Sequence, residues 1–152
     1  MINLEEIKKF LSDFLDISGF INYEIDCKSN EEDKLIEINL RLEESGVLIG
    51  TGGRNLEALE QILRVVINKK IGSEWRLFLD INNYRQNQEE ELKEFARKMA
   101  RQAILNHQEI SLPPMTSRQR RVIHLELAFN SEVTTESIGE GKERHIVIKP
   151  RG

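Results

Sequence analysis

A short glycine-rich segment, Ile49-Gly50-Thr51-Gly52-Gly53-Arg54-Asn55-Leu56, holds the residue types best suited to binding a polyanion. Glycines adopt positive φ angles easily, and because they lack a Cβ atom they let the backbone of another molecule come close. The segment stands directly before an apolar pattern of helical spacing. The first amides of a helix are unpaired and lie at the positive end of its dipole, so we expect a loop that binds phosphate groups.

Three kinds of phosphate-binding loop contain such glycines, and spacing separates them. A dinucleotide-binding fingerprint needs a third glycine where this chain has Asn55, and a buried strand where it has Glu43-Glu44-Ser45-Gly46. A nucleotide-triphosphate loop needs a Gly-Lys-Ser/Thr sequence, which does not follow. The remaining pattern, Gly50-x-x-Gly53 between aliphatic residues, is typical of KH domains, whose loop binds about four nucleotides by their backbone. On this pattern alone, a plain helix-loop-helix turn with a glycine C-cap stays open.

A second candidate site is the basic segment Arg120-Arg121-Val122-Ile123-His124. Arg120 and His124 are four residues apart, so in a helix they share a face. A guanidinium is a permanently charged, bidentate donor for phosphate, and an imidazole one turn on can position it or bind the phosphate itself. Arg118 and Arg121 add positive potential nearby. A solvated basic helix face with a core-packed histidine is the alternative interpretation.

Composition places the chain among ordinary soluble proteins of one domain or two small ones. Of its 152 residues, 39% are hydrophobic and 32% charged, which excludes a disordered or membrane-spanning chain. No apolar run approaches the length of a membrane span, and the acidic N-terminus is unlike a signal peptide. The single cysteine, Cys27, excludes an internal disulfide framework. We therefore expect a cytoplasmic protein without membrane insertion.

Charge is distributed unevenly along the chain. Residues 1–49 contain 5 basic and 12 acidic side chains, whereas residues 50–152 contain 17 basic and 14 acidic ones. Within residues 93–124 the counts are 7 basic and 2 acidic. Counterion release on a nucleic acid requires a local basic surface rather than a basic chain, so the overall charge of −4 does not exclude such binding.

Apolar periodicity predicts two sets of elements. In the first set we expect a helix from residue 4 that ends before Gly19, strands at 21–28 and 36–42 around a turn at 29–33, a short helical turn at 45–49, a helix at 56–67 and a strand at 75–81. In the second set we expect a helix at about 84–106, a short strand at 109–112, a helix at 116–129 and strands at 133–138 and 144–149. The predicted buried stripe of the long helix is Leu92, Phe95, Ala96, Met99, Ala100 and Ala103.

Several of these features occur together in one known family. Gly50-x-x-Gly53 is followed by the run 79–85 at the start of a long helix, by Pro114-Met115 ahead of Arg120-x-x-x-His124, and by the runs 134–141 and 146–150. In this order they resemble the bacterial Jag family, also called SpoIIIJ-associated, KhpB or EloR proteins. The resemblance covers residues 15–150 and is far more specific than either motif alone.

The resemblance implies an α+β fold with a type II-like KH domain (α-β-β-α-α-β) at residues 1–82 and a small α/β R-3-H domain, named for its Arg-x3-His signature, at 83–152. It implies a cytoplasmic, bacterial RNA-binding protein linked to cell elongation and division, often acting with a second small KH protein. It assigns the loop from Gly50 to Gly53 to the RNA backbone, and Arg120 with His124 to a single-stranded nucleic-acid site.

Two departures from the family pattern bear on these expectations. Family loops commonly carry Lys or Arg between the glycines, whereas Thr51 and Gly52 are neutral, so Arg54 would supply the charge. Because only Arg54 lies near for charge, we expect modest affinity from the loop, with much of the electrostatic attraction coming from the second domain. The second departure concerns the N-terminal Jag domain and basic linker that usually precede the KH strands, which we do not expect in this chain.

No other chemistry is readable. His107, His124 and His145 are far apart, and no nucleophile stands in a catalytic context, so we expect no metal, no cofactor and no catalysis. The expected ligand is single-stranded RNA or DNA. Aromatic residues make up only 6% of the chain, which argues against base stacking on the scale of an RRM. The alternative function is a protein-interaction adaptor in which nucleic-acid binding is weak or vestigial.

Overall fold

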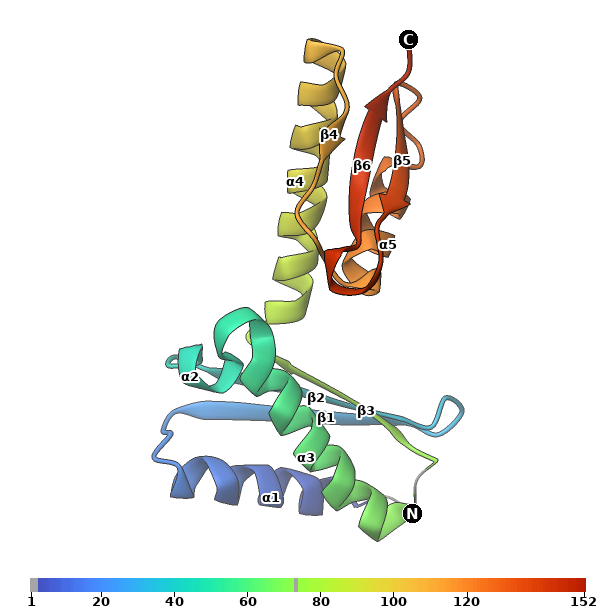
Figure 1. The fold of residues 1–152 in the computed structure, drawn as a ribbon. Coiled ribbons are helices and arrows are strands. Elements are labelled where there is room, and N and C mark those ends of the chain that lie inside the picture. The colour runs from blue at the N-terminus through green and yellow to red at the C-terminus, as the bar shows by residue number, and fades with distance from the viewer. Residues whose placement is uncertain (1–2, 73) are drawn as a thin grey trace. The chain divides into compact units, whose positions relative to one another are not determined.

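The protein is described by a computed structural model that covers residues 3–72 and 74–152. The chain divides into two compact units, the first ending at Arg85 and the second beginning at Gln86. Each unit combines helices with its own three-stranded sheet (Figure 1). The expected α+β class is confirmed.

The first unit has the element order α-β-β-α-α-β. Its elements are α1 (Leu4–Ile17), β1 (Tyr23–Asn30), β2 (Leu35–Leu42), α2 (Gly46–Ile49), the 3-10 turn η1 (Thr51–Gly53), α3 (Arg54–Ile71) and β3 (Arg76–Ile81). The sheet order is β1-β2-β3. β1 and β2 run antiparallel with Tyr23 opposite Leu42, and β2 and β3 run parallel with Leu35 opposite Arg76.

Alternation along the strands produces the core of this unit. In β2, Ile36, Ile38 and Leu40 are almost fully buried, and the residues between them are exposed or half-buried. They pack with Leu11 of α1 and Leu63 of α3, both 0% exposed, in one hydrophobic cluster. Each such side chain contributes roughly 1.5–3 kcal/mol relative to exposure, so the sheet and these two helices form a stable base for the α2–α3 loop.

The second unit is a helix pair on a second sheet. Its elements are α4 (Tyr84–Asn106), whose first two residues belong to the first unit, β4 (Ile110–Ser111), α5 (Ser117–Leu127), β5 (Val133–Ile138), the 3-10 turn η2 (Gly141–Glu143) and β6 (His145–Pro150). The strand order β4-β6-β5 is antiparallel throughout. Ala96, Ala100 and Ala103 of α4 are buried in a cluster with Ile123 of α5 and Ile148 of β6.

Three details of the sequence-based expectation are wrong. β1 begins at Tyr23, which leaves Ile21 outside the strand and 76% exposed and adds two residues of the expected turn to the strand's end. Asn30 tightens the shortened turn, because its side-chain oxygen accepts from two backbone amides of that turn. Phe95 is 36% exposed rather than part of the buried stripe, whereas Leu92 and Met99 are half-buried against the core beside the buried alanines of α4.

Candidate nucleic-acid interface

The Gly50-x-x-Gly53 segment connects α2 to α3 through the single turn η1. All three of its glycines have positive φ: 72° at Gly50, 63° at Gly52 and 82° at Gly53. Its turn is closed by the Gly53 amide, which donates to the Gly50 carbonyl at 3.2 Å. The loop therefore uses conformations that L side chains adopt rarely, which explains glycine at all three positions.

The first glycine is held by a residue that the sequence patterns did not single out. A Cβ atom at Gly50 would lie 2.7 Å from Cγ of Asn55, so this asparagine packs directly against the bare glycine. Nδ2 of Asn55 donates to the Val47 carbonyl at 2.6 Å and thereby ties the first turn of α3 back to α2. In sequence, Asn55 was visible only as the residue that breaks the dinucleotide fingerprint.

The last glycine is covered and the middle one is open. Gly53 is buried, and a Cβ atom there would lie 3.0 Å from the ring of Tyr84. At Gly52 a Cβ atom would meet nothing within 4 Å, and Thr51, Gly52 and Arg54 are exposed. α3 spans 18 residues, and its N-cap residue is Gly53, which has no side chain with which to cap the helix. The exposed face of the loop thus offers backbone, uncapped amides and one guanidinium.

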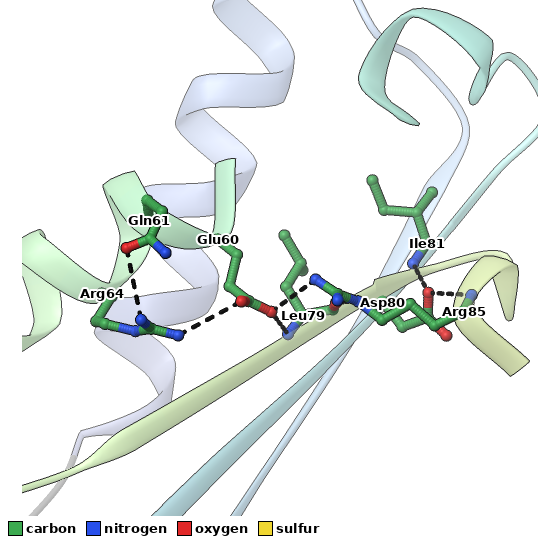
Figure 2. A network of polar contacts seen from close by, with 7 residues as sticks. All are labelled: Glu60, Gln61, Arg64, Leu79, Asp80, Ile81 and Arg85. Atoms are coloured by element: carbon green, nitrogen blue, oxygen red, sulfur yellow. Dashed lines mark hydrogen bonds and ion pairs between the residues drawn. The ribbon is translucent and has the colours of Figure 1, made fainter. Parts of the chain in front are cut away.

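Asp80 fixes the start of α4, where Tyr84 stands. This carboxylate is 6% exposed, and its Oδ1 accepts from the backbone amides of Ile81 at 2.8 Å and Arg85 at 3.2 Å (Figure 2). The two hydrogen bonds satisfy amides at the end of β3 and in the first turn of α4. Tyr84 is thereby held in place over Gly53, so a buried carboxylate supports the glycine loop indirectly.

In the second unit, α5 begins with a capping box formed by Thr116 and Gln119. The Gln119 amide donates to the Thr116 hydroxyl at 3.2 Å, and the Gln119 side chain accepts from the Thr116 amide at 2.9 Å. Nη1 of Arg120 donates to the Met115 carbonyl at 2.7 Å. The guanidinium of Arg120 is therefore positioned by the segment before α5.

His124 contacts β5 through both ring nitrogens. Nδ1 lies 2.7 Å from the Thr135 hydroxyl, and Nε2 lies 2.9 Å from the Ser137 hydroxyl. The pKa of His124 lies below its ordinary value, mainly because the ring is partly buried and in second place because Arg120 is positively charged. The two hydroxyls were not singled out in the sequence, although Thr135 and Ser137 are two residues apart and therefore share a face of the strand. The sequence signal that could have indicated them was a predicted strand with hydroxyl side chains at alternate positions.

Arg118 and Arg121 lie on the exposed side of α5. Within residues 3–72 and 74–152, neither arginine takes part in an ion pair. The same described ranges contain no group of three His, Cys, Asp or Glu side chains arranged to hold a metal ion. None of the helices in these ranges is long and apolar enough to cross a membrane.

The fold and these two sites define a protein that joins a KH domain to an R-3-H domain. Residues 5–79 match the family model for the KH domain of KhpA and KhpB, and residues 90–150 match the model of the R-3-H domain. The chain belongs to the KhpB family.

Curated relatives support this assignment along most of the chain. The RNA-binding protein KhpB of Clostridium symbiosum is 34% identical over 125 residues, which cover 82% of this chain and 56% of the relative. That of Bacillus subtilis is 34% identical over 125 residues, covering 81% of this chain and 60% of the relative. That of Lactiplantibacillus plantarum is 36% identical over 114 residues, covering 75% and 35%. The chain thus spans little more than half the length of the first two.

Proposed function

We propose that this protein binds single-stranded RNA without catalysing a reaction on it, and that it holds the RNA backbone at the Gly50-x-x-Gly53 loop. The observation that carries this proposal is the open position of Gly52. Its Cα faces open space in a left-handed conformation, directly before an 18-residue helix whose N-cap residue is a glycine. A phosphate can approach such a backbone closely and accept hydrogen bonds from it.

Charge supports the same ligand. Arg54 is exposed beside the loop, where it would supply the charge that Thr51 and Gly52 lack. In the second unit, Arg118 and Arg121 are exposed, and we assign them to the backbone-binding surface with Arg120 and His124. The name RNA-binding protein given to the relatives favours RNA over DNA. A cytoplasmic, bacterial setting and a link to cell elongation and division are part of the proposal.

A matched pair of substitutions at Gly52 tests the role of the loop. Asn and Asp tolerate the left-handed conformation about equally and have the same shape, so Gly52→Asp and Gly52→Asn differ in charge alone. We expect Gly52→Asp to weaken binding of a fluorescent single-stranded RNA by about tenfold or more relative to Gly52→Asn, because a carboxylate then opposes the phosphate. Equal affinities of the two variants would show that no phosphate lies at this position.

Salt titration tests the electrostatic part of the proposal. The logarithm of the association constant should fall linearly with the logarithm of the salt concentration, with a slope of about 0.7 for each neutralised phosphate. Arg121→Gln should reduce that slope by about one such step. Glu126→Gln serves as the control on the same helix, because Glu126 is engaged by Arg97 and lies off the exposed arginine face. A salt-independent affinity would rule out phosphate neutralisation.

A second candidate function is that of an adaptor which binds a second small KH protein. The observation that favours it is an apolar groove between α1 and α3, lined among others by Ile7, Phe10, Leu63 and Ile67. The KH model that this chain matches is shared by KhpA and KhpB.

Phe10 offers the test of the adaptor function, because it lines the groove and is 37% exposed. Phe10→Ser should abolish a complex with a purified small KH protein in size-exclusion chromatography with light scattering. Ile17→Ser, on the same helix but not lining the groove and 88% exposed, should leave that complex intact. A complex that survives Phe10→Ser would exclude this groove as its interface.

A further inference from the structure

One face of α5 exposes four residues whose combination the fold does not explain. Arg118, Arg121, Leu125 and Phe129 are spaced by three, four and four residues, so they form a single row, which we call the outer stripe of α5. Leu125 is 60% exposed and Phe129 is 97% exposed. Although α5 ends at Leu127, Ala128 keeps helical angles (φ −59°, ψ −32°), so Phe129 continues the row.

The outer stripe contributes little to the stability of its own unit. The opposite face of α5 holds the core residues Ile123 and Leu127, which are 0% and 4% exposed. Arg118 stands in the first turn, which contains no acidic residue, and a cation there opposes the positive end of the helix dipole. A single exposed apolar residue is common on protein surfaces. An exposed Leu and Phe one turn apart, in line with two arginines, instead form one continuous surface that a ligand could contact.

The chemistry of the outer stripe matches a single strand of nucleic acid. Proteins that bind single strands combine cations along the backbone with aromatic or apolar side chains on which bases stack. Both arginines lack an ion-pair partner in the described ranges, and Glu126, the sole acid on α5, forms an ion pair with Arg97 of α4. The stripe therefore presents cations at one end and an apolar surface at the other, and the one anion of the helix is already paired with a cation of α4.

We propose that Leu125 and Phe129 form a base-stacking platform, on which one or two bases of a single strand rest while Arg118 and Arg121 bind the adjoining phosphates. This inference rests on the proposed function and extends it from backbone binding to base contact. The platform would let the second unit favour strands whose bases are unstacked. Because it uses a single exposed aromatic residue, it agrees with the low aromatic content of the chain.

Phe129→Ala isolates the stacking contribution when two strands with the same number of phosphates are compared. One probe is an oligoadenylate, and the other is an abasic strand of equal length. The variant should bind the oligoadenylate roughly 5- to 150-fold more weakly than the wild type, the loss expected for one stacked base. Its affinity for the abasic strand and its salt slope should not change, because no phosphate contact is removed. Leu105→Ala is the control for loss of an exposed apolar side chain, since Leu105 is 77% exposed on α4.

A tryptophan at the same place reports on stacking directly. Phe129→Trp should keep the wild-type affinity for the oligoadenylate, and its fluorescence should be quenched by that strand and not by the abasic one. The natural Trp75 is 8% exposed and provides a constant background.

The results separate the platform from the function on which it rests. If the wild type binds neither strand, the proposed function fails and the platform fails with it. If the wild type binds both strands and Phe129→Ala binds them equally well, with no quenching in Phe129→Trp, backbone binding stands and the platform is overturned. The platform is also overturned if Phe129→Ala keeps full affinity for RNA and loses a protein partner instead.

Discussion

The carboxylate of Glu60 on α3 lies 2.9 Å from Nη2 of Arg85, and these two side chains together bind both polar backbone atoms of Leu79 (Figure 2). Oε2 of Glu60 accepts from the Leu79 amide at 3.0 Å, and Nε of Arg85 donates to the Leu79 carbonyl at 3.0 Å. Since β3 is an edge strand, the ion pair occupies the place where another strand would otherwise pair. It also joins α3, which follows the glycine loop, to the first turn of α4.

Removing one partner of this ion pair should destabilise the first unit strongly. Arg85→Met leaves the Glu60 carboxylate, only 13% exposed, without its nearest cation and leaves the Leu79 carbonyl without a donor. We expect the free energy of unfolding to fall by about 2–3 kcal/mol, below the range for fully buried pairs. Urea unfolding followed by the fluorescence of Trp75, which lies in the core of this unit, measures the change.

A double-mutant cycle separates the ion pair from lost packing. Glu60→Gln combined with Arg85→Met should cost less than the sum of the single changes by about 1 kcal/mol or more, because the residues share hydrogen bonds. Lys70→Met is the control, since its ion pair with Glu6 is more than half exposed and contributes less than about 1 kcal/mol. Additive single changes would mean that Glu60 and Arg85 act independently.

The glycines of the loop should differ in what a side chain does to stability. At Gly52, alanine costs about 1–2 kcal/mol for its left-handed conformation and meets no neighbour. At Gly50, where φ is 72° and ψ is 176°, the backbone region is essentially restricted to glycine, and the new Cβ also collides with Asn55. Gly50→Ala should therefore lower the free energy of unfolding by at least about 1 kcal/mol more than Gly52→Ala.

Asn55 provides the internal check of this difference. In an Asn55→Ala background the two nearest atoms that a Cβ at Gly50 would meet, Cγ and Nδ2, are absent. The added cost of Gly50→Ala should therefore shrink in that background, measured by urea unfolding with Trp75 fluorescence. An unchanged cost would assign the whole effect to backbone strain.

Local patterns predicted most of the fold because the signals lie within single elements. The alternation at 36–42 reports a strand with one buried face, and the apolar repeat of α3 reports a helix on that face. The capping box of α5 is likewise a local feature, since its partners Thr116 and Gln119 are three residues apart. The errors fall where such local signals are weak: Ile21 continues a strand-like alternation outside the strand, and Phe95 adjoins a helical stripe whose other predicted members pack against the core.

The sequence motifs predicted where the two candidate sites lie, but not which residues outside the motifs contact them. Glycine spacing located the loop, but the contact of Asn55 with Gly50 depends on how α3 leaves that loop. The hydroxyls that bind His124 come from a strand beyond the helix, and their register with α5 is a property of the folded unit. The binding roles of the loop and of the arginines stay predictions that the proposed experiments test.

Cys27 should react very slowly in the folded protein. Burial raises the pKa of its thiol to about 11, and the side chain is 7% exposed. At pH 8 roughly one thiol in a thousand is then ionised, about 100-fold fewer than in the unfolded chain, and access is restricted as well. Reaction with Ellman's reagent should thus be over 100-fold slower in buffer than in guanidinium.

A relocated thiol is the control for Cys27. Ser29 is exposed on the same strand, so Ser29→Cys in a Cys27→Ala background should react rapidly in the folded state. A native Cys27 that reacts within tenfold of the unfolded rate would contradict its burial.

The raised pKa of Cys27 also makes stability depend on pH. Because the pKa is raised in the folded state, the contribution of Cys27 to stability is complete below the ordinary pKa of about 9 and is lost as the pH rises toward 11.

His124 should make the second unit less stable in mild acid. Its pKa is lowered by burial of the ring and by the charge of Arg120, so the folded state binds a proton less readily than the unfolded chain. The stability that this group contributes is present above its ordinary pKa of about 6.5 and is lost as the pH falls through the lowered value. Between pH 7.5 and 5.5 the urea midpoint of the second unit, followed by the NMR methyl signals of Ile123 and Ile148, should fall more in the wild type than in His124→Gln. The glutamine keeps a donor and an acceptor for Thr135 and Ser137 but does not titrate.

The part played by Arg120 can be measured on the histidine itself. In an NMR titration, Arg120→Gln should raise the pKa of His124 toward its ordinary value without restoring it fully, because burial, the larger cause, remains. His124→Gln identifies the ring signal among the three histidines of the chain. A pKa that is unchanged by Arg120→Gln would show that the guanidinium, held by the Met115 carbonyl, does not act on the ring. A bound strand that engages Arg120 should itself raise the pKa of His124, since phosphate cancels the repulsion and favours the protonated ring.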